Sequence, residues 1–234
     1  EYQSKLSPAA WLCTQWRKKR IPLPEPILVT KSFCIERFIP GKTLKESILP
    51  ARKKEKILFA LGKLIRKMHT LKGKGWGEPR YSPKGKSHSW AAYLDRWWKP
   101  SIRTLRKKAF LPKKTIKRLE EIYAENLPFY SGKGAFLHND IKPHHVILRE
   151  NGIAGIIDAS DFIVGDPLYE LGLLREYTPK KEFEALMKGY GTRNEKKALF
   201  YTLYQLAGRI ARYRGRRGKR KIKLREILDE YAEL

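Results

Sequence analysis

Cysteine and long apolar runs are both scarce in this 234-residue sequence, and each shortage excludes a class of protein. The only cysteines, Cys13 and Cys34, lack the paired spacing of a disulfide-stabilised secreted domain, so we expect two reduced thiols. No run of 18 apolar residues occurs, which excludes a transmembrane helix of the usual length. Because no segment resembles a signal peptide either, we expect a cytoplasmic protein that is at most peripheral at a membrane. The apolar content of 41% is enough to build the core of one large domain or two lobes.

Acidic residues are also few. Lys and Arg total 51 against 24 Asp and Glu, which gives a formal net charge of +27 at pH 7. Such a field attracts anions and repels cations, so a polycationic substrate would need an acidic cleft built against it. The charge therefore favours an anionic or neutral partner, such as a phosphorylated or lipid-linked substrate or an anionic membrane surface. A surface that is basic only for solubility would give the same composition.

The most informative stretch is HNDIKPHH at residues 138–145, which is followed by IID at residues 156–158. It places two carboxylates and an imidazole at fixed spacing, with His145 five positions after Asp140 (145 − 140 = 5) and Asp158 eighteen after it (158 − 140 = 18). Between them, two apolar runs flank a turn that contains Asn and Gly, which is typical of a β-hairpin. A hairpin folds its ends together, so we expect Asp140, His145 and Asp158 to lie close in space. This is the layout of a kinase catalytic loop followed by a metal-binding aspartate.

Taken together, the motifs resemble those of the aminoglycoside phosphotransferase and choline kinase-like family, which has the protein-kinase fold. The family pattern is roughly H-G-D-x-x-x-x-N, then I-D, then G-D-P-x-x-D-L. This chain has HNDIKPHH, then ID at 157–158, then GDPLYEL at 165–171. Further similarities are IPLP at 21–24, IERFIPG at 35–41, LIRKMH at 64–69, GWG at 75–77 and SWAAYL at 89–94. The resemblance covers about residues 8–190.

The resemblance implies an α+β, protein-kinase-like fold, with a small β-rich N-terminal lobe and a larger, mainly helical C-terminal lobe. We assign residues 1–40 to part of the N-lobe and residues 41–234 to the C-lobe, which would carry the catalytic hairpin at 138–158. Neither a Gly-rich phosphate-covering loop nor a strand of the V-A-x-K type precedes residue 20. We therefore expect an incomplete N-lobe, either because strands precede this sequence or because the lobe is reduced.

The resemblance also assigns roles in catalysis and metal binding. Asp140 would orient the acceptor hydroxyl and take its proton, and Lys142 would neutralise charge on the transferred phosphoryl group. Asp158 would hold Mg²⁺ between the nucleotide phosphates, since hard oxygen ligands suit that ion. His145 stands where the family usually has Asn and would be the second ligand, a change that would also suit Mn²⁺.

Nucleotide binding and structural support are assigned in the same way. The donor, ATP or GTP, would bind the backbone of the hinge near Glu36 and Phe38. His138 is expected to hold the catalytic loop by hydrogen bonding, and Asp166 is expected to brace that loop as the family's structural aspartate.

Apolar periodicity and turn signals predict the remaining elements. Ser7 and Pro8 predict the cap and first position of a helix that runs to Arg20, and Ser89 predicts the cap of a second helix rich in tryptophan. Other helices are expected at residues 50–71, 112–124, 182–190, 196–213 and near the C-terminus, and strands at 27–29 and 32–39.

A basic run extends from Arg209 to Arg225, with ten Lys or Arg and no acid. It could dock on an anionic membrane surface. Nucleic acid is the less favoured partner, because the run lacks the interleaved aromatic residues of base-stacking surfaces. A solvated loop and helix face is the equal alternative.

The sequence thus predicts a Mg²⁺-dependent kinase that transfers the terminal phosphoryl group of a nucleoside triphosphate to a hydroxyl of a small molecule, sugar or lipid-linked glycan. Two alternatives stay open. An atypical Ser/Thr protein kinase would explain Lys142, although no A-P-E segment follows Asp158. A catalytically inactive kinase-fold module that binds anionic RNA or a membrane would explain the net charge.

Overall fold

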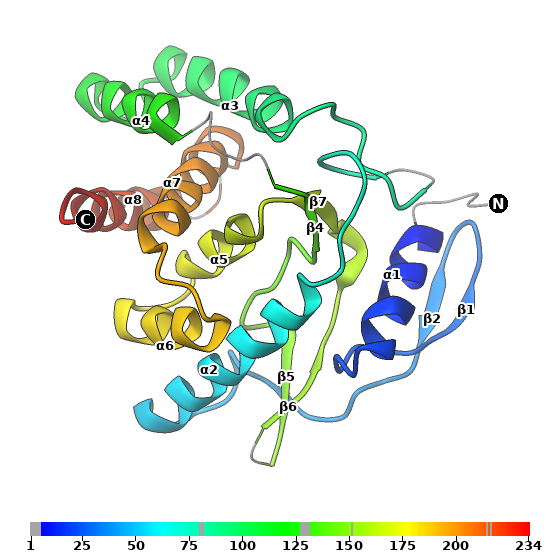
Figure 1. Cartoon of the computed structure of the whole chain (residues 1–234). Coiled ribbons are helices and arrows are strands. Elements are labelled where there is room, and N and C mark those ends of the chain that lie inside the picture. Colours follow the sequence, from blue (N-terminus) through cyan, green and yellow to red (C-terminus); the bar gives the residue numbers. More distant parts are fainter. Residues whose placement is uncertain (1–5, 80–81, 127–131, 151, 214, 216) are drawn as a thin grey trace.

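A computed structural model describes residues 6–79, 82–126, 132–150, 152–213, 215 and 217–234 of the chain. Helix α1 (Leu6–Lys18) and the antiparallel hairpin of β1 (Pro26–Val29) and β2 (Cys34–Glu36) lie on one side of the molecule (Figure 1). A larger helical group lies on the other side, with the remaining strands between the two. The predicted α+β, two-lobe kinase-like fold is confirmed.

The larger group is built around one buried helix. It contains α2 (Ala51–Met68), α3 (Trp90–Lys107), α4 (Lys113–Asn126), α5 (Pro167–Arg175), α6 (Lys180–Tyr190), α7 (Glu195–Arg212) and α8 (Arg217–Ala232). Every residue of α7 from 198 to 208 is buried, because α3, α4, α5 and α8 all pack against it. A helix that is apolar on all sides must lie inside the core, and α7 therefore organises the lobe.

The strands bring the motif residues to one place. Strands β3 (Lys42–Thr43), β5 (Val146–Arg149) and β6 (Gly152–Ile156) form an antiparallel sheet in the order β3-β5-β6, and β4 (Ala135–Leu137) pairs with β7 (Ile163–Gly165). The predicted hairpin is β5 and β6, with Val146 opposite Ile156. The catalytic loop joins β4 to β5, and the segment after Asp158, which includes the 3₁₀ turn η2 (Ala159–Asp161), joins β6 to β7. Both loops consequently leave the strands at the same end.

Several predicted element boundaries are shifted in the structure. Helix α1 begins at Leu6, so the prediction that Ser7 caps it was wrong; Pro8 lies in the first turn, where the missing N–H has no intrahelical acceptor. The helix ends at Lys18 rather than Arg20, because Arg20 has a left-handed φ of 55°. By contrast, Ser89 does cap α3, with its hydroxyl accepting a hydrogen bond from the Ala92 N–H at 3.1 Å.

Neither cysteine forms a disulfide in the structure. Cys13 is buried in α1 and Cys34 is partly buried in β2. Burial raises the pKa of the Cys13 thiol to about 12, so this thiol stays protonated at neutral pH. Within the described residues, every helix is too short or too polar to traverse a membrane.

Helices α2 and α6 approach each other closely through two glycines. A Cβ atom at Gly62 would lie 2.2 Å from the Leu186 carbonyl oxygen, and one at Gly189 would lie 2.0 Å from the Phe59 carbonyl oxygen. These distances are far below van der Waals contact and the obstructing atoms are backbone. The crossing therefore depends on the absence of both side chains.

A Gly189→Ala substitution is expected to lower the free energy of unfolding by about 1–3 kcal/mol, the usual range for overpacking a core. Thermal unfolding would measure the loss. Gly152→Ala is the matched control, because a Cβ at Gly152 would meet nothing within 4 Å. Equal melting temperatures for the two variants would contradict a tight α2–α6 crossing.

Candidate active site

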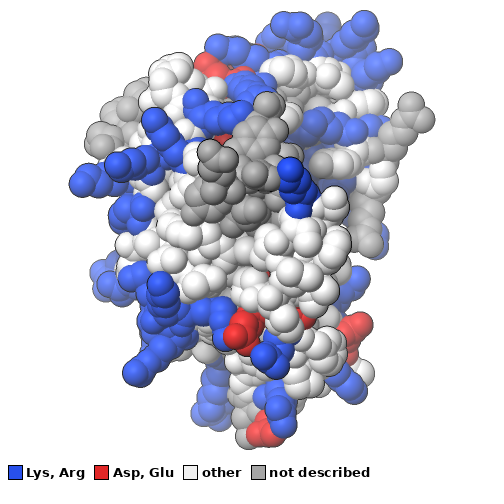
Figure 2. Space-filling view, turned by 90° about the vertical axis from the view of Figure 1, so that its right-hand side faces the viewer, with Lys and Arg blue, Asp and Glu red and all other residues white. Residues whose placement is uncertain are grey.

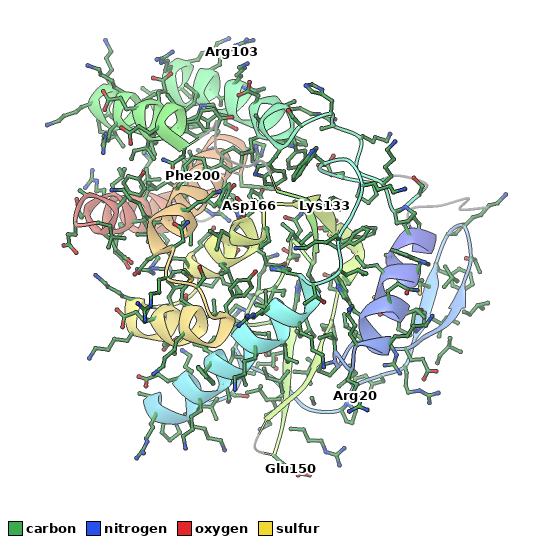
Figure 3. The ribbon with its side chains drawn as sticks, viewed as in Figure 1. Arg20, Arg103, Lys133, Glu150, Asp166 and Phe200 are labelled. Atoms are coloured by element: carbon green, nitrogen blue, oxygen red, sulfur yellow. The ribbon has the colours of Figure 1, made fainter. Side chains whose placement is uncertain are left out.

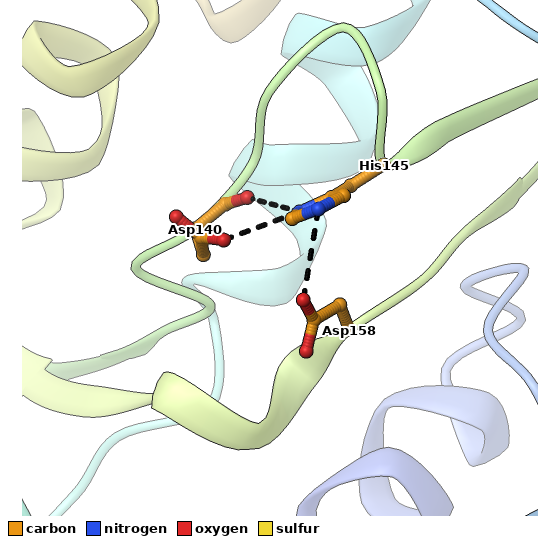
Figure 4. A group of neighbouring side chains, drawn as sticks. All are labelled: Asp140, His145 and Asp158. Carbon is orange, nitrogen blue, oxygen red and sulfur yellow. Dashed lines mark hydrogen bonds and ion pairs between the residues drawn. The ribbon is translucent and has the colours of Figure 1, made fainter. Parts of the chain in front are cut away.

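Asp140, His145 and Asp158 meet at the ends of the hairpin strands (Figure 4). The ligand atoms that these three residues offer all lie within 4.8 Å of one another. The hairpin closes the arrangement, since the Ile157 N–H donates to the His145 carbonyl oxygen at 2.9 Å. The proximity predicted from the sequence spacing is thus present in the fold.

His145 is oriented so that one ring nitrogen faces Asp158. Its Nδ1 lies 2.8 Å from the Asp140 carbonyl oxygen, which can only accept a hydrogen bond, so Nδ1 carries the proton. Nε2 keeps a lone pair in the neutral ring, and this atom lies 3.6 Å from Asp158 Oδ2. Two electron-pair donors that face each other at this distance would be bridged well by a divalent cation. A backbone acceptor on the far nitrogen is also the usual way that a ligating histidine is fixed.

Asp158 adopts an unusual backbone conformation. Its φ of 65° and ψ of 57° lie in the left-handed region, which residues other than glycine seldom adopt. The Ser160 hydroxyl donates to Asp158 Oδ1 at 3.0 Å, which leaves Oδ2 for His145 and a ligand. About half of the Asp158 side chain is exposed, so a nucleotide phosphate can reach it. Backbone strain of this kind tends to occur where function requires it.

Lys142 and Asp140 form an ion pair inside the catalytic loop. Lys142 Nζ lies 2.5 Å from Asp140 Oδ1, and the two side chains are 25% and 16% exposed. The second carboxylate oxygen, Oδ2, lies 3.3 Å from His145 Nδ1. The ammonium group is therefore positioned beside the carboxylate that we expect to receive the acceptor proton.

His138 connects the catalytic loop to the strand that precedes Asp158. Its Nε2 donates to the Ile157 carbonyl oxygen at 3.0 Å, and its Nδ1 accepts from the Asp140 N–H at 3.3 Å. The ring is buried and lies nearly parallel to the Trp16 ring of α1, with 6.4 Å between centroids. Burial lowers the pKa of His138, and its contacts require the neutral ring, because a proton on Nδ1 would displace the Asp140 N–H.

The lowered pKa of His138 predicts acid sensitivity. The folded chain binds a proton on His138 less readily than the unfolded chain does. The stabilisation that neutral His138 gives to the fold is therefore complete above the usual pKa of 6.5, and it is lost as the pH falls from 6.5 toward the lower pKa of the folded chain. We expect the free energy of unfolding, measured with urea, to fall between pH 7.5 and 5.5. His138→Gln should reduce the slope of the free energy of unfolding against pH by up to about 1.4 kcal/mol per pH unit. The exposed His88 serves as control, and a His88→Gln variant with the same flattened slope would contradict the assignment.

Glu170 anchors the catalytic loop, and the sequence did not reveal it. This fully buried carboxylate on α5 accepts hydrogen bonds from the Asn139 N–H at 2.6 Å, the His138 N–H at 3.3 Å and His69 Nε2 at 2.7 Å. Burial by itself would raise the pKa of Glu170, but the hydrogen bond and charge of His69 and the hydrogen bond from the Asn139 N–H outweigh it and hold the pKa below its usual value. Two signals were available: Glu170 stands at the second acidic position of the pattern G-D-P-x-x-D-L, and it is a single acid inside the apolar segment PLYELGLL.

Asp166 connects α5 to α7. Its Oδ1 accepts from the Leu168 N–H at 3.0 Å and caps α5, while Oδ2 lies 2.7 Å from the Tyr201 hydroxyl and 2.8 Å from Lys197 Nζ. Figure 3 shows it deep in the helical group. These contacts join α5 to α7, and α5 also carries Glu170, which bonds the catalytic loop. The bracing of that loop by Asp166 stays a prediction.

Asn139 occupies the position at which the family pattern has glycine. Its φ is 65°, in the left-handed region that glycine adopts freely and that asparagine tolerates best among the other residues. Its side-chain amide donates to the Asp161 carbonyl oxygen at 2.9 Å and links the two loops of the site. The departure from the pattern is therefore compatible with the same loop shape.

The proposed hinge residues lie at the end of β2 and just after it. The pKa of Glu36 is raised by burial and by the negative charge of Asp158, so the Glu36 side chain lies within electrostatic range of the site. The Phe38 side chain is 83% exposed. Nucleotide binding by this backbone stays a prediction.

A cavity of about 620 Å³ opens beside the catalytic loop on the side of the helical lobe. Asn139, Ser160 and Asp161 line its inner end. The other walls come from α3, α5, α7, Pro8 of α1 and the segment 78–79, which contributes the acid Glu78. They include aromatic and cationic side chains, namely Tyr93, Trp97, Tyr204, Arg96, Arg209 and Arg212. Its volume is typical of sites that bind small molecules.

The basic run of Arg209 to Arg225 is partly engaged inside the molecule. Arg209 and Arg220 both pair with Glu176, Arg212 donates to the Ser101 hydroxyl, and Arg217 stacks on the Phe110 ring. Docking of this run on a membrane stays a prediction. The charge excess is not confined to it, since Lys and Arg also greatly outnumber Asp and Glu on the face that carries α1 and the β1–β2 hairpin (Figure 2).

Comparison with known proteins agrees with this geometry. Residues 6–208 match the model of the phosphotransferase enzyme family, APH. No curated protein matches the chain. Similar solved structures include aminoglycoside phosphotransferase APH(4)-Ia with AMP-PNP and hygromycin B, at a TM-score of 0.75 and 15% identity over 97% of this chain and 83% of that one.

Two further structures have the same fold. ADP-bound aminoglycoside phosphotransferase APH(2'')-Ib has a TM-score of 0.63 and 19% identity over 98% of this chain and 82% of that one. The gentamicin complex of APH(2'')-IIa has a TM-score of 0.60 and 21% identity over 94% of this chain and 79% of that one. With the family match over most of its length, the chain belongs to the phosphotransferase enzyme family and has its kinase-like fold.

Proposed function

We propose that this protein transfers the terminal phosphoryl group of a nucleoside triphosphate, ATP or GTP, to a hydroxyl group of a small molecule. The observation that carries the proposal is the convergence of Asp140, His145 and Asp158 on one point, with Nε2 of His145 and Oδ2 of Asp158 facing each other. This intact cluster favours an enzyme over the inactive kinase-fold alternative. A small-molecule acceptor agrees with the cavity of about 620 Å³ beside the loop.

His145 and Asp158 would hold a divalent metal ion, Mg²⁺ or Mn²⁺. Carboxylate oxygen suits both ions, and imidazole nitrogen is better tolerated by Mn²⁺. When bound, the ion would neutralise charge on the nucleotide phosphates. The nucleotide base would bind near the backbone of Glu36 and Phe38.

Asp140 would orient the acceptor and receive its proton. The acceptor oxygen attacks the terminal phosphorus, the bond from that phosphorus to the bridging oxygen breaks, and its electron pair leaves with the nucleoside diphosphate. The hydroxyl proton passes to Asp140 Oδ2. The Lys142 ammonium group, whose Nζ lies 2.5 Å from Oδ1, would neutralise charge on the transferred phosphoryl group.

Calorimetric titration of the protein with AMP-PNP, with and without Mg²⁺, tests the proposal. Binding should require the metal, and Asp158→Ala should weaken it at least about tenfold, because a charged ligand of the metal is lost. Asp229→Ala, a change of an exposed aspartate on α8, should leave it unchanged. Binding that is independent of both Mg²⁺ and Asp158 would argue against this site.

A further inference from the structure

The cavity adjoins the two loops that carry the proposed phosphoryl-transfer site. Two of its lining residues, Asn139 and Ser160, connect it to the site: Asn139 directly precedes Asp140, and the Ser160 hydroxyl is bonded to Asp158. A molecule in the cavity would therefore lie against the catalytic loop that carries Asp140. The opposite wall is formed by α3 and the C-terminal end of α7, and it should decide which molecule is accepted.

That wall carries an unusual stack of one aromatic ring and two guanidinium groups. The guanidinium carbons of Arg96 and Arg212 each lie 5.4 Å from the centroid of the Trp97 ring. Cation–π contacts of this kind hold a guanidinium group in place without consuming its hydrogen-bond donors. Both arginine side chains are consequently positioned at the cavity with donors still free for a ligand.

The charge of these two arginines is poorly neutralised. Among the described residues, no carboxylate lies within ion-pair distance of Arg212, whose hydrogen bond goes to the neutral Ser101 hydroxyl at 3.2 Å. Arg96 approaches Glu78 only at 3.9 Å, and both side chains are about half exposed, so this pair is weak. The third arginine of the cavity, Arg209, differs because it is paired with the nearly buried Glu176.

We infer that the acceptor is an anion: a hydroxylated small molecule with a phosphate group that binds Arg96 and Arg212, while its hydroxyl reaches Asp140. This inference rests on the proposed function and names its substrate class. A guanidinium group forms paired hydrogen bonds with phosphate, and two such groups match the double charge of a phosphate monoester. A polycation would be repelled by the same wall.

The test is calorimetric titration of the full chain with four probes: inorganic phosphate, glucose 6-phosphate, glucose and glucosamine. AMP-PNP and Mg²⁺ are present throughout so that the nucleotide site is filled. Both phosphate probes are expected to bind, glucose to bind at least about tenfold more weakly, and glucosamine most weakly. Absence of binding by both phosphate probes, or tighter binding of glucosamine, would overturn the inference.

Variants locate the binding. Arg96→Gln and Arg212→Gln should each weaken phosphate binding about 10-fold to 100-fold, the range for the loss of a charged hydrogen bond, and Arg212→Lys should fall between wild type and Gln. Arg103→Gln is the control, because Arg103 is exposed on the outward side of α3, away from the cavity (Figure 3). Phosphate binding that is unchanged in both Gln variants would show that the anion binds elsewhere.

Binding measurements on an Asp158→Ala variant separate this inference from the proposed function. Asp158→Ala should weaken metal-dependent nucleotide binding at least about tenfold but keep the Arg212-dependent binding of phosphate. If wild type binds no nucleotide yet binds phosphate through Arg96 and Arg212, the anion site stands and the proposed function fails. If wild type binds nucleotide but Arg212→Gln leaves phosphate binding intact, only the anion site fails.

Discussion

An Asp140→Asn variant is expected to lower kcat about 10²-fold to 10⁴-fold, the range for removing a general base. Asparagine has almost the same shape as aspartate, and so the loop should keep its structure while losing the group that accepts the proton. The amide is also uncharged, which removes the ion pair with Lys142 Nζ at 2.5 Å. The rate of nucleoside diphosphate release, with an acceptor found by screening phosphorylated polyols, would measure the effect.

The affinity for nucleotide separates a loss of chemistry from a loss of binding. We expect the Kd for AMP-PNP with Mg²⁺ to change little in Asp140→Asn, since the proposed metal contacts of His145 and Asp158 are retained. Asp229→Asn, an exposed change on α8, is the matched control and should keep wild-type kcat. An Asp140→Asn enzyme with kcat close to that of wild type would exclude the role proposed for Asp140.

Replacing Glu170 by Gln is expected to lower the free energy of unfolding by about 3–5 kcal/mol, as when one partner of a buried charged pair is removed. The amide keeps the size of the side chain. In wild type, the carboxylate oxygens accept hydrogen bonds from the N–H groups of His138 and Asn139 and from the ring of His69. The NH₂ group of glutamine cannot accept and would face one of these donors. Urea unfolding at pH 7 would measure the loss. Glu150→Gln, at the exposed tip of the β5–β6 hairpin (Figure 3), should change the free energy of unfolding by less than about 0.5 kcal/mol.

Glu170→Gln should also lower kcat, because Glu170 fixes the backbone of the two residues before Asp140. The pKa of Glu170 is lowered in the folded chain, so its stabilisation is complete above the usual pKa of 4.5 and is lost as the pH falls through the folded value. The deficit of the variant should therefore shrink below pH 4.5. A Glu170→Gln protein that unfolds like wild type at pH 7 would show that the loop is held by other contacts.

The central part of the site could be predicted because its geometry is local. The residues from Asp140 to Asp158 form a loop and a hairpin, and hairpin pairing follows from the position of the turn. The cap of α3 by Ser89 was predictable for the same reason, since a cap depends on three or four neighbouring residues. Local rules also have limits, as the start of α1 shows: Pro8 fits anywhere in a first turn, so it did not fix the boundary.

The supporting contacts could not be predicted, because they join elements that are distant in sequence. Glu170 reaches His69 and the catalytic loop only after α5 has packed beneath β4. Likewise, Arg96 and Arg212 meet on Trp97 because α3 crosses α7. The sequence gives the chemical type of each side chain but not the packing that brings them together, and a net charge of +27 does not identify which arginines face a cavity.

The most direct test of the central claim is to locate a metal ion in crystals grown with AMP-PNP and Mn²⁺, by anomalous diffraction. The account predicts a Mn²⁺ peak in contact with His145 Nε2, Asp158 Oδ2 and the nucleotide phosphates, and loss of this peak in Asp158→Ala. Bound nucleotide with no metal peak at His145 and Asp158, or with the peak at other residues, would contradict it.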